Sequence, residues 1–299
     1  SGANSSTHKW EIILLPKGWD IVQDAMDLTR TAIETGCSPA LWYFVGDVTD
    51  AFYKIPLLAQ EQRYFVLAHD GAYYVWRRLG QGSLNGPTLF GRLSAMLGRM
   101  TQGILEGSGA TAQFYVDDPI ISMRASEQEA KDLVARVLLF WRILGLDLAT
   151  HKAQLAREVT WIGYTIKDDT LDTSMAIKES FLEDLRADTA KIRKQHVLSL
   201  RALRSYAGRC NHVSNLLYGW RPFLDALWAA IAQREGKGGA KIKKSRAPKH
   251  MIWRKQLDSS LKWIAAFLRY SPKRLSRSWS YEEFFDKGED MTVTLDASP

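Results

Sequence analysis

Two short apolar segments, Ala112 to Val116 and Pro119 to Met123, lie on either side of the adjacent acids Asp117 and Asp118. Each segment has the length and the aromatic or β-branched content of a strand, and aspartate is common in turns. The pattern therefore predicts a β-hairpin whose tip carries two carboxylates. Because a single hairpin is at best marginally stable in water, further elements must pack against it.

A helix is predicted on each side of this hairpin. Asn85 can cap the first helix, Pro87 lies in its first turn, and its expected apolar face is formed by Phe90, Leu93, Leu97, Met100 and Ile104. Ser126 and Glu129 form a capping box that opens the second helix, and Gly145 ends it. The apolar stripe of the second helix consists of Ala130, Leu133, Val134, Val137, Leu138 and Trp141.

Strands are expected before and after this helix–hairpin–helix segment. Residues 41–47 (LWYFVGD) read as a strand that ends in an acid, and Glu158 to Ile166 reads as another. Two further short strands, Tyr64 to Leu67 and Tyr73 to Arg77, flank the turn signal Asp70-Gly71. The order strand, helix, hairpin, helix, strand is the split βαβ plan of an α+β fold, with two helices on one face of a sheet.

The pattern becomes mainly helical after about residue 175. One apolar stripe is formed by Leu200, Leu203, Ala207, Cys210, Val213 and Leu217. A further amphipathic helix is expected over Trp253 to Phe267, and a last strand over Met291 to Leu295. Residues 237–249 (KGGAKIKKSRAPK) hold six basic residues and no acid, which is typical of a loop or linker.

Size and charge narrow the class of protein. A chain of 299 residues exceeds what one hydrophobic core usually supports, so two or three subdomains are expected. The formal net charge of +7 favours a polyanionic partner weakly, since a solvated basic surface gives the same sum. No apolar run is long enough for a bilayer span and no signal peptide precedes the first charged residues, so a soluble intracellular protein, cytoplasmic or nuclear, is expected.

The predicted plan brings carboxylates together. Asp47 ends the first strand, and in a split βαβ sheet this strand can be a neighbour of the hairpin that carries Asp117 and Asp118. Carboxylates that converge at one edge repel each other unless cations lie between them, so the arrangement favours divalent metal. Two Mg²⁺ ions there would suit phosphoryl transfer, with Mn²⁺ as an alternative. An acidic pair at a hairpin tip is, taken alone, more often an ordinary turn.

Five segments in order resemble motifs of reverse transcriptases. They are Asp47-Val-Thr-Asp-Ala-Phe-Tyr-Lys-Ile-Pro-Leu57, Leu79-Gly-Gln-Gly-Ser-Leu-Asn-Gly-Pro87, Phe114-Tyr-Val-Asp-Asp118, Leu144-Gly-Leu-Asp-Leu-Ala-Thr-His-Lys-Ala-Gln154 and Trp161-Ile-Gly-Tyr164. The likeness is to retroviral and LTR-retrotransposon polymerases and covers roughly residues 41–230. It implies a polymerase right hand with a split-βαβ palm, partial fingers, a helical thumb and a connection segment.

The resemblance implies catalytic and substrate-binding roles. Asp47, Asp117 and Asp118 match the metal-binding triad, and Lys152 matches a lysine thought to protonate the leaving pyrophosphate; without the resemblance Lys152 reads as a surface lysine. Phe52 resembles a steric gate against a 2′-hydroxyl, and its ordinary alternative is a core aromatic. Residues expected at the deoxynucleoside triphosphate are Asp50, Ala51, Phe52, Gln81, Gly82 and Tyr115.

Two further segments resemble contacts with nucleic acid. Ile162, Gly163 and Tyr164 look like the hairpin that grips the primer end. The segment Tyr206-Ala-Gly-Arg-Cys-Asn-His212 resembles the thumb helix along the minor groove, with Gly208, Arg209, Asn211 and His212 as its nucleic-acid face. A plain amphipathic helix with a solvated basic side is an equally good reading of the second segment.

The sequence departs from the family pattern at several positions. Gly80 and Gly86 replace a common proline and serine, and Pro119 follows the acidic pair, where its missing N–H leaves one ladder bond unmade. No Arg-x-x-x-Asp-x-Arg-like stretch precedes Asp47, and the Thr292-Val-Thr-Leu-Asp-Ala-Ser298 segment resembles the first strand of a ribonuclease H domain, with Asp296 its first carboxylate. We therefore expect a piece of a longer polyprotein that contains a ribonuclease H domain.

The expected subdivision follows these motifs. It comprises 1–40 as a remnant of fingers, 41–58 as the first part of the palm, 59–84 as a fingers insertion, 85–172 as the second part of the palm, 173–236 as a helical thumb, 237–289 as basic linker and connection segment, and 290–299 as the first ribonuclease H strand.

The resulting hypothesis is an RNA-directed DNA polymerase of a retroelement, which extends a primer on an RNA or DNA template with deoxynucleoside triphosphates. Two alternatives stay open at this point. One is a nucleic-acid-binding remnant without catalysis, suggested by the missing fingers residues and Pro119. The other is an RNA-directed RNA polymerase on the same palm, which the side chain at position 52 would distinguish.

Overall fold

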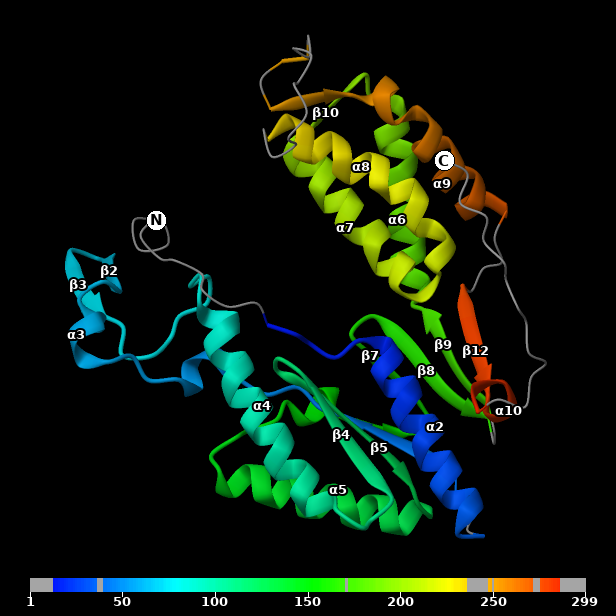
Figure 1. Cartoon of the computed structure of the whole chain (residues 1–299). Helices are drawn as coiled ribbons and strands as arrows, with labels where there is room; N and C mark the ends of the chain where they lie inside the picture. Colours follow the sequence, from blue (N-terminus) through cyan, green and yellow to red (C-terminus); the bar gives the residue numbers. More distant parts are fainter. Residues whose placement is uncertain are drawn as a thin grey trace, which may run out of the picture. The chain divides into compact units, whose positions relative to one another are not determined.

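The computed structural model describes residues 13–36, 40–169, 172–235, 247–248, 250–270 and 275–285 (Figure 1). The expected last strand with Asp296, and nearly all of the basic segment 237–249, lie outside these ranges. The chain folds as two compact units. The first comprises residues 1–162, 166–173 and 279–299, and the second residues 163–165 and 174–278. No helix of the described part is long and apolar enough to cross a membrane.

The first unit contains the predicted hairpin and the elements around it. In chain order these elements are α2 (Gly18–Glu34), β1 (Leu41–Val45), η1 (Ala51–Lys54), α3 (Ala59–Gln62), β2 (Val66–His69), β3 (Ala72–Val75), α4 (Gly86–Leu105), β4 (Ala110–Tyr115), β5 (Asp118–Arg124), α5 (Glu127–Ile143), η2 (Thr150–Lys152), β6 (Gln154–Ala156), β7 (Glu158–Trp161) and α10 (Tyr281–Phe284).

The central sheet has the strand order β4-β5-β1-β6. β5 pairs antiparallel with β4 on one side and with β1 on the other, and the register sets Val45 opposite Ile120. The predicted hairpin is therefore confirmed, and the first predicted strand is its direct neighbour. This neighbourhood brings the residues after β1 beside the hairpin tip.

Opposite faces of this sheet pack against different helices, because successive side chains on a strand point to opposite sides. Phe44 of β1 and Ile121 of β5 belong to one apolar core cluster, together with Leu97 of α4 and Val137 and Trp141 of α5. Figure 1 shows α4 and α5 beside the β4–β5 hairpin, and α4 contacts β4 while α5 contacts β1. The expected sheet with two helices on one face is thus confirmed.

Helix α2 covers the other face of the sheet, which the sequence analysis did not predict. Gln113 of β4 donates to Asp24 of α2 at 3.0 Å, and Arg124 of β5 donates to Thr29 of α2 at 2.6 Å. The region was expected to be a remnant of fingers, and the helix within it packs on strands of the central sheet. The proposed subdomain bounds stay a prediction.

Three expectations about local structure need correction. Met100 is 39% exposed, and the buried stripe of α4 runs through Phe90, Ser94, Leu97, Thr101 and Leu105. The expected strand Glu158 to Ile166 is two strands, β7 and β8 (Tyr164–Asp169), because Ile162 and Gly163 adopt positive φ of 40° and 85°. The expected helix from Trp253 begins later, since 251–253 form β11 and 254–257 form η4.

The second unit is mainly helical, as expected for residues after 175. Its helices and short strands are α6 (Glu179–Lys194), β10 (Val197–Ser199), α7 (Leu200–Leu216), η3 (Tyr218–Trp220), α8 (Arg221–Arg234), β11 (Met251–Trp253), η4 (Arg254–Leu257) and α9 (Asp258–Tyr270). Leu203, Ala207, Cys210 and Val213 of the predicted stripe of α7 are fully buried.

A further sheet has the order β12-β9-β8-β7, with β9 at Asp172–Ile177 and β12 at Ser276–Ser280.

Candidate active site

A cavity of about 620 Å³ lies at the end of β1, and we call it the β1-edge cavity. Its lining comes from the segments 47–52 and 148–152, with Gln81 and Asp117 added. Seven residues that the sequence predicted as functional line it together: Asp47, Asp50, Ala51, Phe52, Gln81, Asp117 and Lys152. These residues are up to 105 positions apart in the chain, so the fold brings them together.

Backbone hydrogen bonds fix Asp47 between two loops. The N–H of Val48 donates to the carbonyl of Asp117 at 2.9 Å, which ties the end of β1 to the hairpin tip. The N–H of Ala149 donates to the carbonyl of Asp47 at 2.9 Å, which ties the same residue to the loop before η2. Asp47 is therefore held by main chain on both sides, and its position does not depend on its own side chain.

The turn of the hairpin lies one residue earlier than the sequence suggested, at Val116 and Asp117 between β4 and β5. Val116 adopts a positive φ of 58°, and its carbonyl accepts a hydrogen bond from the hydroxyl of Ser94 at 2.5 Å. Asp118 is already the first residue of β5 and pairs with Tyr115. Its carbonyl accepts a hydrogen bond from the indole of Trp161 at 3.0 Å. The two acids thus occupy different positions, one in the turn and one in the strand.

Pro119 costs the hairpin little. It lies in β5 opposite Phe114, and its carbonyl accepts a hydrogen bond from the N–H of Gly46 at 3.1 Å. A proline lacks only the donor, so its carbonyl can still bond to the neighbouring strand. Gly46 and Pro119 thereby add a second tie between the end of β1 and the hairpin.

The three carboxylates affect one another electrostatically. The pKa of Asp118 is raised to about 6, mainly by burial and then by the negative charges of Asp117 and Asp47, while the positive charge of Lys152 lowers it. Such mutual repulsion is expected when carboxylates converge without a cation between them. The predicted convergence of Asp47, Asp117 and Asp118 therefore has a measurable consequence at Asp118.

Lys152 is the cation nearest to this cluster. Its ammonium group bonds the carboxylate of Asp47, and this contact raises the pKa of Lys152, with smaller contributions from Asp118 and Asp117. The lysine, which is protonated at neutral pH in any case, therefore holds its proton more tightly. Because Lys152 pairs with Asp47, its positive charge offsets the negative charge of this member of the predicted triad.

Divalent metal fits the donor chemistry of this edge. Carboxylate oxygens are the ligands that Mg²⁺ prefers, and a cation would relieve the repulsion that raises the pKa of Asp118. Within the ranges that the structure describes, no group of three or more His, Cys, Asp or Glu side chains is arranged as a metal site. Here the ammonium group of Lys152 bonds one carboxylate oxygen of Asp47, so a metal ion would compete with this cation for the carboxylate.

Phe52 belongs both to the cavity and to the core. It lines the β1-edge cavity, and its ring also packs against Phe90 with 5.8 Å between ring centroids. A Cβ at Gly86 would lie 3.4 Å from this ring, an ordinary van der Waals contact. The two readings of Phe52, a gate and a core aromatic, are therefore not exclusive, because packing holds the ring at the cavity wall.

Some predicted substrate residues lie outside the cavity lining. Gly82 and Tyr115 do not line it, and neither does Asp118. Tyr115 instead meets Trp161 edge to face at 6.2 Å between centroids. Asp50 does line the cavity and adopts a positive φ of 54°, which starts η1. Whether these residues contact a nucleotide stays a prediction.

The predicted primer grip is built around His212 in the second unit. The ring of His212 stacks on Tyr164 with 4.3 Å between centroids, and the Tyr164 hydroxyl donates to the carbonyl of His212 at 2.9 Å. Phe181 of α6 lies against the same ring at 4.9 Å. Burial lowers the pKa of His212. The imidazole therefore supports the segment 163–164, a role that the sequence did not suggest.

The other residues of the predicted nucleic-acid face lie on α7. Gly208 and Asn211 are exposed, and no heavy atom lies within 4 Å of a Cβ built at Gly208. Arg209 is half-buried and forms an ion pair with Asp188 of α6. The face therefore presents an open glycine and an asparagine, and the charge of Arg209 is already compensated.

The sequence analysis missed several residues of the cavity. Val48, Thr49, Leu148, Ala149, Thr150 and His151 also line it. Trp161, which bonds the carbonyl of Asp118, was noted only as part of a motif. Each lies next to a predicted residue or inside a quoted motif, so neighbourhood in the chain was the available signal.

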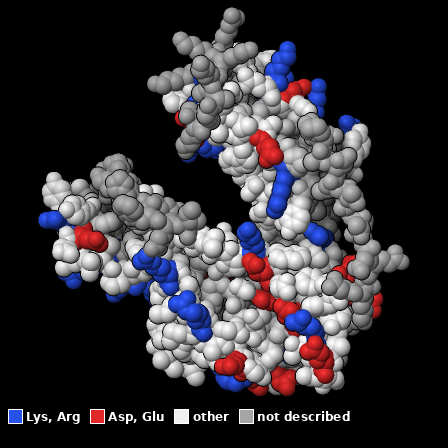
Figure 2. Space-filling view, viewed as in Figure 1, with Lys and Arg blue, Asp and Glu red and all other residues white. Residues whose placement is uncertain are grey.

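Charge is unevenly distributed over the first unit. Figure 2 shows acidic side chains gathered along α2, whose acids include Asp20, Asp24 and Asp27. Basic side chains gather over α4 and the β2–β3 hairpin, where Arg92 and Arg99 lie on the helix. A polyanion would be attracted to the basic surface over α4 and the β2–β3 hairpin more than to the acidic surface along α2.

An antiparallel sheet with carboxylates at a hairpin tip and at the end of the neighbouring strand is the arrangement expected for the palm of a nucleic-acid polymerase. Comparison with known families agrees with this class. Residues 20–166 match the family model described as "Reverse transcriptase (RNA-dependent DNA polymerase)", and this segment is a reverse transcriptase domain.

Curated relatives are retroviral polyproteins. The chain is 34% identical over 153 residues to the Gag-Pol polyprotein of avian reticuloendotheliosis virus. The aligned segment covers 48% of this chain and 13% of the polyprotein. It is 25% identical over 191 residues to the Gag-Pol polyprotein of walleye dermal sarcoma virus. This aligned segment covers 63% of this chain and 10% of that protein. The chain thus spans a small part of these relatives' length.

Solved structures share the fold. The foamy viral protease-reverse transcriptase in complex with RNA/DNA hybrid matches with a TM-score of 0.53 and 20% identity, over 77% of this chain and 27% of that one. The same type of protein in complex with dsDNA matches with a TM-score of 0.54 and 18% identity, over 90% and 48%. The predicted polymerase fold is confirmed by these matches.

Proposed function

We propose that the chain is the polymerase portion of a retroelement and extends a primer on an RNA template with deoxynucleoside triphosphates. The observation that carries this proposal is the β1-edge cavity, where Asp47, Asp117 and Lys152 line one space with Phe52. The match of residues 20–166 to the reverse transcriptase family supports the same reaction. DNA templates are included, because the same site chemistry serves either template.

Each predicted site residue in or beside the cavity has a distinct task in this proposal, and Asp118 is the one that does not line it. Asp47, Asp117 and Asp118 would hold two Mg²⁺ ions, or Mn²⁺ in their place, which when bound activate the primer 3′-hydroxyl and neutralise charge on the phosphates. Lys152 is protonated at neutral pH and lies beside Asp47 in the cavity, so it can donate a proton to a leaving pyrophosphate. Phe52 would exclude a 2′-hydroxyl by its ring.

The second unit supplies the expected surface for primer and template. Gly208 leaves open space on α7, so a nucleic-acid backbone can approach the helix closely. Gly163 and Tyr164 are held by His212, which suits a segment that positions the primer end. The foamy viral structures with RNA/DNA hybrid and with dsDNA have the same fold, which supports this kind of partner.

Primer extension on an RNA template with Mg²⁺ tests the proposal. Asp117→Asn combined with Asp118→Asn should reduce extension by about 10³-fold or more, because it removes two anionic metal ligands. Asp132→Asn, at an exposed position of α5, is the matched control and should extend like the unaltered protein. Extension by the double variant at the control's rate would refute the assigned mechanism.

A binding protein without catalysis is the alternative from another class. The observation that favours it is the ion pair of Asp47 with Lys152, in which a cation of the protein already bonds one of the three predicted metal ligands. This alternative predicts salt-sensitive binding of primer-template, measured by fluorescence anisotropy, and no extension at any Mg²⁺ or Mn²⁺ concentration. Extension above background excludes it.

The side chain of Phe52 distinguishes the proposed DNA polymerase from an RNA-directed RNA polymerase with the same palm. Phe52→Ala should raise the use of ribonucleotides relative to deoxynucleotides by about tenfold or more, because the ring no longer occupies the wall of the cavity. Phe90→Ala removes the ring against which Phe52 packs and leaves the cavity lining complete, so it serves as a control for a general loss of packing. Unchanged sugar selectivity in Phe52→Ala would contradict the gate.

A further inference from the structure

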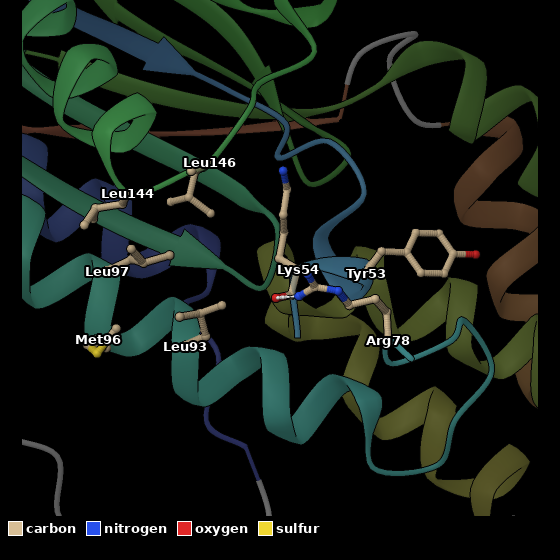
Figure 3. Close-up of a pocket in the computed structure, with 9 residues that line it drawn as sticks. Tyr53, Lys54, Arg78, Leu93, Met96, Leu97, Leu144 and Leu146 are labelled. Carbon is tan, nitrogen blue, oxygen red and sulfur yellow. Dashed lines mark hydrogen bonds between the residues drawn. The ribbon is translucent and has the colours of Figure 1, made fainter. Parts of the chain in front are cut away.

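A second cavity lies on the first unit, beside α4, and we call it the α4 cavity (Figure 3). Its volume is about 560 Å³, which falls in the range of roughly 300–1,000 Å³ typical of small-molecule sites. The lining residues are Tyr53, Lys54, Arg78, Leu93, Met96, Leu97, Leu144, Gly145 and Leu146. None of these residues lines the β1-edge cavity.

One side of the α4 cavity is apolar. Figure 3 shows Leu93, Met96 and Leu97 of α4 together with Leu144 and Leu146 of the loop after α5. Met96 is 44% exposed and Leu144 is 41% exposed, whereas Leu97 and Leu146 are buried. Large apolar side chains that stay exposed around a concave space are characteristic of ligand grooves.

The other side of the α4 cavity is cationic. The guanidinium of Arg78 donates to the carbonyl of Lys54 at 3.4 Å, and Figure 3 shows both side chains opposite the leucines. Lys54 pairs with Asp147 at 3.0 Å, and Arg142 pairs with the same carboxylate. Arg78 has no carboxylate partner among the described residues, so of the two cations that line the cavity only Lys54 is paired with an acid. The imbalance attracts an anionic group.

Two chain segments connect this cavity to the β1-edge cavity. In η1, Ala51 and Phe52 line the β1-edge cavity, and the next two residues, Tyr53 and Lys54, line the α4 cavity. The segment 144–152 is divided in the same way, with 144–146 on one cavity and 148–152 on the other.

Asp147 lies between the two parts of this segment. Its carbonyl accepts a hydrogen bond from the N–H of Thr49 at 2.8 Å, and its carboxylate accepts the ion pair from Lys54. A ligand that moves Leu146 or competes for Lys54 therefore acts on the segment that holds Lys152 and bonds the carbonyl of Asp47.

We propose that the α4 cavity binds a small amphipathic anion, an apolar body of two or three rings with one sulfonate or carboxylate, and that its occupancy alters the β1-edge cavity. The apolar body lies against the leucines and Met96, and the anionic group lies beside Arg78 and Lys54. The effect on nucleotide addition rests on the proposed polymerase function, whereas binding and its local structural effect do not.

The binding experiment uses 1-anilinonaphthalene-8-sulfonate, whose emission rises in apolar surroundings, as the probe. Arg78→Ala should weaken its binding about tenfold by removing the uncompensated cation, and Met96→Glu should do the same by adding a like charge to the wall. The matched controls are Arg77→Ala, next to Arg78 in the chain, and Met100→Glu, one turn further along α4. Neither control residue lines the cavity, and both controls should bind within about twofold of the unaltered protein.

Equal losses in the test and control variants would overturn the site. Hydrogen–deuterium exchange tests the coupling without any activity: the probe should slow exchange in 47–52 and 144–152 of the unaltered protein and leave both segments unchanged in Met96→Glu. Binding at the cavity with no change in either segment would overturn the coupling.

Primer extension gives the second readout of coupling. The probe should slow extension by the unaltered protein and have no effect on extension by Met96→Glu at the same concentration. A protein that binds the probe as described but extends no primer would refute the polymerase proposal and leave the site standing.

Discussion

The ammonium group of Lys152 bonds the carboxylate of Asp47 across 105 positions of the chain. The pair is formed because η2 follows the loop that bonds the carbonyl of Asp47, so main chain brings the lysine to the end of β1. Lys152 is mostly exposed, with 57% of its side chain accessible, so the pair contributes little to folding. Its significance is that one cation both neutralises a predicted metal ligand and lines the β1-edge cavity.

Lys152→Met should separate these two effects. We expect the free energy of unfolding to stay nearly unchanged and the maximum rate of primer extension to fall by about 10²-fold, because the proton donor is lost. The Mg²⁺ concentration for half-maximal rate should fall, because the ammonium group of Lys152 no longer competes with Mg²⁺ for the carboxylate of Asp47. Lys131→Met, which removes an exposed pair with Glu127 on α5, is the control. A raised Mg²⁺ requirement in Lys152→Met would contradict the competition.

Asp118 should make the metal-free protein sensitive to pH. Its pKa in the folded protein is about 6, above the ordinary value of 3.8, so the folded state binds the proton more tightly than the unfolded state does. The resulting stabilisation is complete below pH 3.8 and is lost as pH rises through 6. Relative to the unaltered protein, Asp118→Asn should therefore be more stable at pH 7.5 by about 1–2 kcal/mol, after allowance for solvent screening, and similar in stability at pH 4.

Chemical denaturation at the two pH values measures this difference. Added Mg²⁺ should reduce or reverse it, because a bound cation relieves the repulsion that Asn would otherwise remove; NaCl at matched ionic strength is the control. A stability difference of the same size at pH 4 and pH 7.5 would contradict the electrostatic origin.

Most of the palm could be predicted from local signals. Ser126 and Glu129 form the expected capping box, in which the N–H of Ser126 donates to Glu129 at 2.8 Å. The expected turn at Asp70-Gly71 joins β2 to β3, with positive φ at both residues. These features depend on residues a few positions apart, so the sequence carries them directly.

Other features depend on contacts that no local pattern contains. Residues 158–166 alternate like one strand, so the periodicity does not show the turn at Ile162 and Gly163, where both residues have positive φ. Only the resemblance to the primer-gripping hairpin suggested a turn at this place. Arg124 at the end of β5 lies 3.7 Å from Asp168 of β8, and both side chains are buried. Neither residue attracted attention in the sequence, because the pair exists only after the fold has formed.

The candidate site divides in the same way. Asp47, Asp117 and Lys152 could be predicted because ordered motifs carry them, and they line one cavity. The support that His212 gives to Tyr164 could not be predicted, because a histidine on the presumed outer side of a helix gives no sign of stacking within its own unit. The α4 cavity was missed for a similar reason, since its leucines read as ordinary helix and loop residues.

Gly163 should be intolerant of any side chain for two reasons. Its φ is 85°, and a Cβ there would lie 3.0 Å from Nε2 of His212. Gly163→Ala should lower the free energy of unfolding by about 2–3 kcal/mol, of which about 1 kcal/mol is backbone strain. Gly71→Ala, with φ of 74° and open space, carries the strain alone and is the control.

A double-mutant cycle with His212→Ala isolates the clash at Gly163. In the His212→Ala background, the cost of Gly163→Ala should fall to that of Gly71→Ala, because the imidazole is no longer there. Thermal or urea denaturation of the four proteins gives the coupling free energy. Additive costs would show that His212 does not hold this segment.

Gly208 distinguishes a structural helix from a nucleic-acid surface. It is exposed in the middle of α7, its φ is not positive, and no atom lies within 4 Å of a Cβ built there. Gly208→Ala should therefore stabilise the fold by about 0.5–1 kcal/mol, since alanine is the better helix former. If primer-template lies against this face, the same methyl group should weaken its binding by about tenfold, because the backbones can no longer approach.

Gly103→Ala on α4 is the matched control, since Gly103 is also an exposed helical glycine in open space. It should give the same stabilisation and leave primer-template affinity within about twofold, because Gly103 lies outside the predicted nucleic-acid face of α7. Urea denaturation and fluorescence anisotropy measure the two quantities on the same samples. Gly208→Ala with higher stability and undiminished affinity would show that α7 is a plain amphipathic helix at this position, and the predicted face would have to lie elsewhere.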